Sequence, residues 1–277
     1  MSLRILYQDA SLVAVDKPEG FHVHPPEDQQ HQIPRSQNCL FILRKQLQAY
    51  LYPVHRLDRA TSGVLLFALK PEVARSISEM FQRNEIKKTY YALVRGHVAP
   101  GKKIVDHPLR SQSRTHGRAH ASVQSQDAGI AELETRRDSS SLDLLESVGQ
   151  PAVTHYEVLS QIELPYAVGK YPSSRYSLVE IRPQSGRMHQ IRRHFAHLSH
   201  PLIGDTIYGD GPHNRFFREF FGVRMLYLKA AELKLVHPET GLNLMIQSKW
   251  NHPWHQVFEL FGVCPRRGLD LNWASGF

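Results

Sequence analysis

The sequence predicts one α+β domain built around a largely antiparallel sheet. Short apolar runs typical of strands are mixed with segments of helical spacing, without the strict strand–helix–strand order of a parallel sheet. A length of 277 residues and an apolar fraction of 41% suit a globular chain with a sizeable core. We expect residues 1–277 to form this single domain.

The first fifth of the chain predicts two strands, a loop and a helix. Residues 5–7 and 12–15 are short apolar runs, and the second ends at the turn sequence Lys17-Pro18-Glu19-Gly20. Residues 25–37 are polar and contain prolines, which predicts a loop. Apolar side chains then recur at helical spacing over residues 39–52.

A buried strand, a helix and another strand are expected next. Residues 64–69 are uniformly apolar and too few for a core helix, so they predict a buried strand. Pro71 suits the first position of a helix that runs to about Asn84. The apolar face of this helix consists of Val73, Ile77, Met80 and Phe81. Residues 89–94 are aromatic and aliphatic, as in a strand.

Residues 111–150 differ in composition from the rest of the chain. They are rich in Ser, Gln, Arg and Asp and contain few large apolar side chains. Such a segment buries too little apolar surface to offset the entropy of ordering it. We therefore expect a flexible insert at 111–150.

The remaining sequence returns to a globular pattern. It predicts strands at 153–159, 176–181, 228–236 and 244–247, a helix at about 187–198, a turn-rich passage at 201–215, and an amphipathic C-terminal helix. The apolar face of that last helix carries Trp254, Val257, Phe258 and Phe261.

The charge of the chain points to a polyanionic partner. The formal net charge is +8 and the pI is about 9.5. Residues 175–200 contain five arginines and only one acid, Glu180, so they contribute +4, half of the total. Because guanidinium groups match phosphates, we expect nucleic acid as the partner.

Cysteine content and hydropathy indicate the cellular compartment in which the protein works. Cys39 and Cys264 are the two cysteines, too few for a disulfide framework, which favours a reducing environment. The N-terminus lacks the apolar core of a signal peptide, and no apolar run is long enough to cross a bilayer. We expect a soluble cytoplasmic protein that does not bind membranes.

The strongest candidate for chemistry is the segment 55–63, His-Arg-Leu-Asp-Arg-Ala-Thr-Ser-Gly. Asp58 lies between Arg56 and Arg59, just before the buried strand, and neighbouring guanidinium groups favour its ionised form. A kinase catalytic loop is excluded, because the chain lacks the later Asp-Phe-Gly sequence. The structural alternative is an acid that merely pairs with an arginine at a turn.

Two further segments support a nucleic-acid site. Residues 87–96 place Tyr90 on a basic strand, although strand tyrosines usually serve packing. In residues 185–194, Gly186 is expected to begin a helix that presents several donors: Arg187, His189, Gln190, Arg192 and Arg193. The alternative for this helix is a solvated basic face.

Metal and nucleotide-cofactor signatures are absent from the sequence. His194, His197 and His200 are spaced by three, without the nearby acid or thiolate of zinc sites, so we expect no metal. The chain also contains no Walker-type phosphate loop, no Gly-x-Gly-x-x-Gly fingerprint and no Gly-x-Ser-x-Gly elbow.

Taken in order, these segments resemble the RluA-type family of pseudouridine synthases. The resemblance rests on residues 5–20, 55–63, 88–96, 186–194 and 200–205, and it spans nearly everything outside 111–150. It implies the pseudouridine-synthase catalytic fold, with a cleft, helices and loops around a mixed, mostly antiparallel central sheet. No segment here resembles the S4 RNA-binding module of some relatives, so RNA binding is assigned to the catalytic domain.

The resemblance implies an isomerase that needs no cofactor. Residues 151–156, 169–176 and 192–198 are most similar to the branch that modifies uridine 65 of certain tRNAs. The expected partner is therefore tRNA, bound by a monomer, and the expected product is pseudouridine. Ribosomal RNA as the substrate, and a non-catalytic RNA-binding role, remain the alternatives.

The same resemblance implies roles for individual residues. Asp58 is the essential acid, which either attacks the sugar or removes a sugar proton. Arg192 is the arginine that pairs with it, and Tyr90 packs beside the target base. Arg56 is expected to enter the space that the flipped uridine leaves. The RNA-binding set is completed by Lys88, Arg187, His189 and Arg193.

Overall fold

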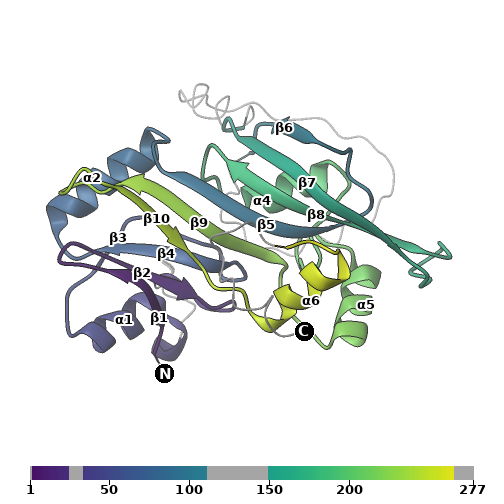
Figure 1. Ribbon diagram of the computed structural model, residues 1–277, viewed down its shortest axis with the longest axis horizontal. Helices are drawn as coiled ribbons and strands as arrows, with labels where there is room; N and C mark the ends of the chain where they lie inside the picture. The colour runs from purple at the N-terminus through teal and green to yellow at the C-terminus, as the bar shows by residue number, and fades with distance from the viewer. Residues whose placement is uncertain (1, 25–33, 111–148, 265–277) are drawn as a thin grey trace, which may run out of the picture.

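The structure is a computed structural model that describes residues 2–24, 34–110 and 149–264 (Figure 1). Within these residues ten strands form one sheet in the order β1-β2-β4-β9-β5-β8-β7-β6, with β10 beside β9 and β3 beside β4. Every pairing is antiparallel except that of β4 with β9, which is parallel and short. The predicted α+β class with a mixed, mostly antiparallel sheet is confirmed.

The strands have the following bounds: β1 Arg4–Gln8, β2 Leu12–Lys17, β3 Tyr52–Pro53, β4 Ser62–Ala68, β5 Lys87–Arg95, β6 Lys102–Asp106, β7 Val153–Leu164, β8 Ser174–Pro183, β9 Leu228–Val236 and β10 Asn243–Gln247. The helices are α1 Cys39–Leu47, α2 Pro71–Gln82, α4 Gln190–His197, α5 Gly211–Phe221 and α6 His252–Leu260, preceded by a 3₁₀ turn at Arg35–Gln37. All seven residues of β4 are buried, as the apolar run predicts.

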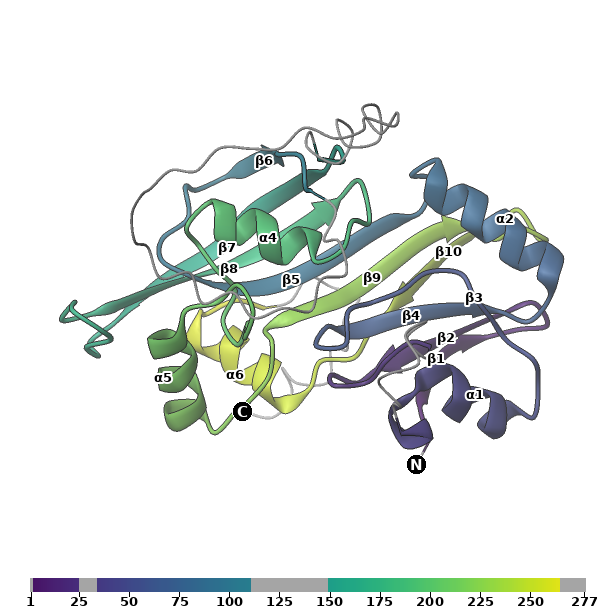
Figure 2. The same ribbon diagram turned by 180° about the vertical axis from the view of Figure 1, so that it is seen from behind.

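Strand β9 shows how the helices divide between the two faces of the sheet, because successive strand residues point to opposite faces. Leu228 belongs to the hydrophobic cluster that contains α4 residues, and Ala230 to the cluster that contains α1 residues. Ala231 belongs to the cluster that contains α5 and α6 residues, and Leu233 to the cluster that contains α2 residues. Helices α1 and α4 therefore cover one face, which Figure 2 shows from the front.

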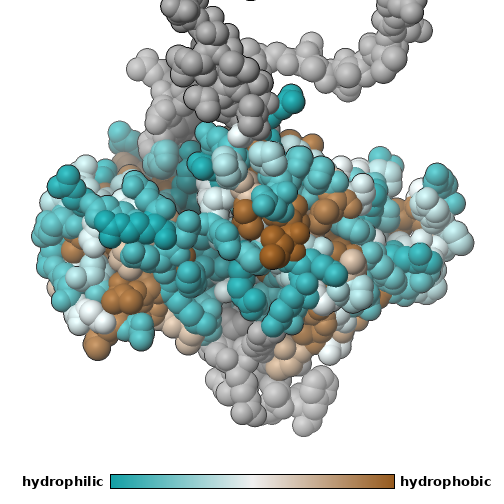
Figure 3. Space-filling view, turned by 90° about the horizontal axis from the view of Figure 1, so that it is seen from above, coloured by the Kyte–Doolittle hydropathy of each residue, from teal (hydrophilic) through white to brown (hydrophobic). Residues whose placement is uncertain are grey.

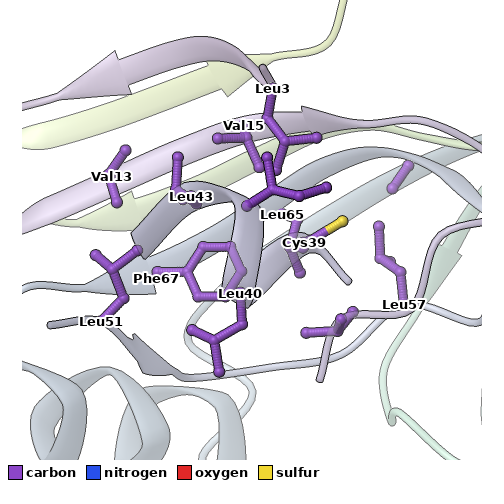
Figure 4. Packing of buried hydrophobic residues seen from close by; sticks show 13 residues of the cluster. Leu3, Val13, Val15, Cys39, Leu40, Leu43, Leu51, Leu57, Leu65 and Phe67 are labelled. Atoms are coloured by element: carbon purple, nitrogen blue, oxygen red, sulfur yellow. The ribbon is translucent and has the colours of Figure 1, made fainter. Parts of the chain in front are cut away.

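The face covered by α1 and α4 has two hydrophobic clusters. In the α1 cluster, Cys39 and Leu43 of the helix meet Val15 of β2 and Leu65 and Phe67 of β4 (Figure 4). In the α4 cluster, the helix packs on β5 and β8; its members include Ala92, Val94, Val179, Ile181, Ile191 and Phe195. The boundary between these two clusters holds the site described below.

Two predicted helices are shorter than expected. The helix predicted over 39–52 ends at Leu47, because Gln48 takes a left-handed conformation with φ of 50°, and residues 52–53 form β3 instead. The helix predicted to begin near Gly186 begins at Gln190, because His189 is left-handed with φ of 55°. Of the loop predicted at 25–37, residues 25–33 lie outside the described part, and 35–37 form the 3₁₀ turn.

Two elements were not predicted. Helix α5 begins inside the passage predicted as turns; the Asp210 side chain caps it by accepting from the amide of His213 at 3.2 Å. Strand β6 pairs with β7 at the sheet edge. The insert predicted at 111–150 lies outside the described residues except for its last two, where Gln150 pairs with Leu109.

The face seen from above is largely hydrophilic, with separate apolar patches (Figure 3). Among the described helices, none combines the length and apolar character that a membrane span requires.

Candidate active site

Asp58 lies in the loop that leads into β4, at the boundary between the α1 and α4 clusters. The preceding Leu57 is buried in the α1 cluster, and Ala60 packs against the α4 cluster. The Asp58 side chain is 20% exposed and lines a cavity of about 280 Å³. The carboxylate is thus held between two cores while it still reaches an open space.

The buried side chain of Lys17 holds the Asp58 loop in place through hydrogen bonds. The Lys17 ammonium group donates to the carbonyl oxygens of Pro18, Arg59 and Thr61 at 3.1, 3.0 and 2.8 Å. The side chain is fully buried, and burial lowers its pKa to about 8. Because two of its acceptors follow Asp58 by one and three residues, Lys17 fixes the conformation of the Asp58 loop. This role was not predicted.

His55, the first residue of the motif, is structural. Its Nε2 accepts a hydrogen bond from the amide of Leu66 at 2.9 Å, and this requires the neutral ring. Burial, and then the charge of Lys88, lower the pKa of His55 to about 3. His55 therefore ties the start of the Asp58 loop to β4 and remains uncharged at neutral pH.

Gly63 permits the close approach of β4 and β9 directly after the loop. Its φ is +116°, and a Cβ atom there would lie 2.0 Å from the carbonyl oxygen of Ala230. No side chain fits that space, so close packing of the two strands explains why the motif has a glycine at position 63. The parallel pairing of Gly63 with Ala230 brings β4 into the sheet beside β9, at the boundary that Asp58 occupies.

Arg192 from α4 faces Asp58 across the cavity, as expected. Its Nη1 lies 3.7 Å from Asp58 Oδ2, and its side chain is only 4% exposed. The same guanidinium donates to both carboxylate oxygens of Asp205 at 2.7 and 2.8 Å. Burial alone would lower the pKa of Arg192, but the hydrogen bonds and charge of Asp205, with that of Asp58, raise it. Arg192 therefore remains charged between two carboxylates.

Asp205 is a site residue that the sequence analysis did not single out. Besides Arg192, its Oδ1 accepts from the amides of Ile207 and Tyr208 at 2.9 and 3.0 Å. Burial would raise the pKa of Asp205, but its hydrogen bonds to Arg192 and to these amides lower it. Its position directly after Gly204, in one of the matched segments, was the available signal.

Tyr90 reaches the same cavity from β5. A β-bulge between Thr89 and Tyr90 interrupts the register with β9 and changes the direction of the strand at this point. Tyr90 packs partly against both the α1 and α4 clusters. Burial, and then the negative charge of Asp58, raise the pKa of Tyr90. Its hydroxyl is therefore protonated at neutral pH.

The five residues predicted to bind RNA divide into two groups. Arg56, Arg187 and His189 line the cavity with Asp58, and His189 Nε2 lies 3.9 Å from Asp58 Oδ1. Lys88 and Arg193 do not line it. Lys88 donates to the carbonyl of Ser185 at 3.3 Å, and Arg193 donates to that of Arg110 at 3.1 Å.

Gln190 fixes the conformation of the loop at 185–187, which lines the cavity. Its Oε1 accepts from Ser185 Oγ at 2.7 Å and from the amide of Arg187 at 3.1 Å, and its Nε2 donates to Thr154 Oγ1 at 3.0 Å. Its side chain thus joins the loop at 185–187 to β7. The sequence analysis counted Gln190 among exposed donors, but it is buried.

The three regularly spaced histidines have separate partners. His194 lies within 2.9 Å of Thr154 Oγ1 and 3.0 Å of the His107 carbonyl oxygen. His197 stacks on the ring of His107, and His200 Nδ1 lies 2.8 Å from the carbonyl oxygen of Arg95. Within the described residues, no cluster of three or more His, Cys, Asp or Glu side chains is arranged to hold a metal ion.

The arrangement suits chemistry at one carboxylate beside a planar group. The guanidinium of Arg192 lies within ion-pair distance of the Asp58 carboxylate, and the ring of Tyr90 supplies an aromatic wall. Arg56 and Arg187 add positive charge at the cavity, which favours an anionic ligand.

Comparison with known proteins shows which chains are similar to this one. Residues 11–197 match the RNA pseudouridylate synthase family. "tRNA pseudouridine synthase C" of Pectobacterium carotovorum subsp. carotovorum is 43% identical over 99% of this chain and 67% of its own length. The protein of that name from Vibrio cholerae is 40% identical over 94% of this chain and 96% of its own length.

Solved structures show the same fold. "Human RNA Pseudouridylate Synthase Domain Containing 4" superposes with a TM-score of 0.64 at 26% identity, covering 94% of this chain and 93% of that one. "Human RNA Pseudouridylate Synthase Domain Containing 1" superposes with a TM-score of 0.60 at 21% identity, covering 95% and 96% of the two chains.

Proposed function

We propose that this chain, which belongs to the RNA pseudouridylate synthase family, converts a uridine of tRNA into pseudouridine. Membership of the family makes it an isomerase. The tRNA substrate is inferred from relatives named tRNA pseudouridine synthase C, which match this chain at 40–43% identity over 94–99% of its length. Neither ribosomal RNA nor a non-catalytic role is favoured by these relatives.

The observation that carries the proposal is the distance of 3.7 Å between Arg192 and Asp58 in a cavity that Tyr90 also lines. The reaction breaks the bond from the sugar to N1 of uracil, turns the base, and forms a bond from the same sugar carbon to C5. In our proposal Asp58 acts on the sugar as an ionised carboxylate, by attack or by proton removal. Arg192 pairs with this carboxylate while the detached base covers the site.

The other residues of the cavity hold the substrate. The Tyr90 ring packs beside the uracil, and its protonated hydroxyl is available as a hydrogen-bond donor near Asp58. Arg56 occupies the space in the RNA that the flipped uridine vacates, which offsets a few kcal/mol of lost stacking. Arg187 and His189 contact the RNA backbone at the cavity, while Lys88 and Arg193 contribute charge farther out.

The proposed target is uridine 65, and the proposed active unit is a single chain in the cytoplasm. The resemblance of residues 151–156, 169–176 and 192–198 to the branch that modifies uridine 65 supports the position. Cys39 is a buried thiol outside any disulfide, which is consistent with a reducing compartment.

The test is to map pseudouridine in tRNA and ribosomal RNA from cells with and without this protein. We expect one tRNA position to lose the modification, and purified protein to restore it on the unmodified tRNA. Protein carrying Asp58→Ala should restore nothing while it still binds the tRNA, because phosphate contacts supply most of the affinity. A lost ribosomal site with unchanged tRNA, or full activity of Asp58→Ala, would contradict the proposal.

A further inference from the structure

A second and larger cavity, of about 610 Å³, adjoins the one that Asp58 lines. The two cavities share His189 and Arg192 in their walls. The remaining walls come from the turn after Asp58, from helix α5, and from the segments 203–207 and 223–227. The roles given above to active-site residues leave this space without a ligand.

The inner wall of the second cavity is apolar and partly aromatic. It is formed by Ile203, Phe217, Met225, Leu226 and Tyr227, each of which is at most 5% exposed. These side chains are buried and form the floor of the cavity. Ile207, which also lines the cavity, is 62% exposed and offers apolar surface that a base can contact.

The rim of the cavity is positively charged. Arg59, Arg218 and Arg224 line it with exposed side chains, and Glu19 is the acid among the described lining residues. Burial raises the pKa of Glu19, although the positive charges of Lys17 and Lys229 act to lower it. Within the described part of the chain, no carboxylate forms an ion pair with Arg218 or Arg224, so these guanidinium groups are available to an anion.

One turn of the chain connects the two spaces. Asp58 lines the first cavity, while Arg59 and Ala60, the next two residues, line the second. The larger cavity is therefore within reach of the residue that follows a nucleotide held at Asp58. The combination of apolar surface, arginines at the rim, and walls shared with the first cavity matches a nucleotide of the same strand.

We propose that the second cavity binds the nucleotide adjacent to the target uridine, with its base against Ile207 above the apolar floor and its phosphate at Arg59, Arg218 and Arg224. This inference rests on the proposed function, since it presumes that a uridine occupies the Asp58 cavity. A free nucleotide has the same chemistry, so the experiment below separates an RNA strand from a free nucleotide.

The test combines a filled cavity with a substrate that lacks the neighbouring base. Thr206, exposed at the cavity, is changed to tryptophan to fill it. RNA stem-loops containing the target uridine are made with an abasic residue on its 5′ or its 3′ side. Binding of each RNA to the unchanged protein and to Thr206→Trp is measured at equilibrium.

We expect the abasic residue on one side of the uridine to weaken binding to the unchanged protein by about tenfold or more. Thr206→Trp should weaken binding of intact RNA by a similar factor. It should not weaken binding of that abasic RNA further, because both changes remove the same contact. Effects that multiply independently, or no effect of either abasic residue, would overturn the inference.

A second variant protects the test against misfolding of the first. Arg218→Ala with Arg224→Ala removes two charges from the rim and should weaken RNA binding about tenfold with a shallower salt dependence. The matched control is Arg75→Ala on α2 with Arg83→Ala directly after it, at the opposite end of the sheet (Figure 1), where the same charge is lost at exposed positions. The control should bind RNA with nearly unchanged affinity, and thermal unfolding should show that both proteins fold.

Two further measurements separate the outcomes. In the first, uridine monophosphate is titrated into the unchanged protein and into the Arg218/Arg224 variant. If the unchanged protein binds it saturably, the variant does not, and the abasic residues have no effect on RNA binding, the cavity is a site for a free nucleotide and our inference is wrong. Pseudouridine formation on intact RNA by the unchanged protein reports on the proposed function alone. If no product forms, that function fails, whereas the binding results still decide what the cavity holds.

Discussion

Arg192 forms a two-point ion pair with Asp205, in which Nε and Nη2 lie 2.7 and 2.8 Å from the two carboxylate oxygens. This pairing uses one edge of the guanidinium and leaves Nη1 toward Asp58 at 3.7 Å. A lone arginine side chain samples many rotamers, whereas a bidentate pair fixes the plane of the guanidinium. Asp205 is therefore a positioning residue that directs Arg192 at the candidate catalytic acid.

Replacing Asp205 by Asn should slow the reaction more than it weakens substrate binding. The amide cannot accept both hydrogen bonds of Arg192, so the guanidinium loses its fixed orientation toward Asp58. We expect kcat to fall about 10- to 100-fold, with RNA affinity nearly unchanged, because the geometry of the transition state depends on the oriented groups. Loss of one partner of a buried ion pair should also cost about 3 kcal/mol of folding stability.

The comparison that separates positioning from stability uses Arg192→Lys alone and combined with Asp205→Asn. If Asp205 acts through Arg192, the second change should add little to the kinetic effect of the first. Kinetic effects that multiply would show that Asp205 acts independently of Arg192.

Tyr90→Phe should retain substrate binding but lower the rate. The phenyl ring keeps the aromatic wall of the cavity, while the hydroxyl near Asp58 is lost. If that hydroxyl assists a proton transfer, the single-turnover rate should fall about 10²-fold. Tyr90→Leu should weaken RNA binding as well, because a branched aliphatic chain does not stack on a base. Equal rates for the unchanged protein and Tyr90→Phe would limit the role of Tyr90 to packing.

The buried ammonium group of Lys17 should make stability depend on pH in a specific direction. Burial lowers the pKa from 10.5 to about 8 in the folded chain. Between these values the unfolded chain binds more protons, so the free energy of unfolding rises with pH. We expect this contribution to grow by up to about 3 kcal/mol from pH 7.5 to 10.

Lys17→Met isolates that contribution from the other groups that titrate in the same range, among them Lys88 and Lys229, whose pKa values are also lowered by burial. The free energy of unfolding is measured in urea for both proteins across the pH range. The difference, unchanged protein minus variant, should increase with pH; a difference that stays constant would show that the pKa of Lys17 is not lowered.

Local sequence patterns predicted the elements whose signal is contained within one segment. The uniformly apolar run in β4 and the single apolar face of α2 both fold as the pattern predicts. The position of Asp58 just before β4 followed from the same local signal. Helix α5 was missed because its first two residues, Gly211 and Pro212, read as turn residues, although proline is well accommodated in the first turn of a helix.

The supporting residues of the site could not be predicted from local patterns, because their roles come from distant partners. Lys17 acts on carbonyl groups 42 and 44 residues away. Asp205 acts on an arginine 13 residues earlier and on a different element. The predicted beginning of α4 was wrong because His189, the last residue of the preceding loop, takes a left-handed conformation. Few non-glycine residues adopt this conformation, so a histidine in the sequence does not predict it.

Gly63→Ala should destabilise the fold at the point where the Asp58 loop enters the sheet. The added methyl group would lie 2.0 Å from the Ala230 carbonyl oxygen, and the φ of +116° is unfavourable for alanine. Relief requires β4 to move away from β9, which would also displace the loop that carries Asp58. We expect the free energy of unfolding, measured in urea, to fall by at least about 3 kcal/mol, from overpacking and backbone strain together.

The matched control is Gly211→Ala at the start of α5, where no atom lies within 4 Å of the added methyl group. The stability of this variant should equal or exceed that of the unchanged protein, because alanine favours the helix. Equal stabilities for the two variants would mean that the β4–β9 contact tolerates a side chain.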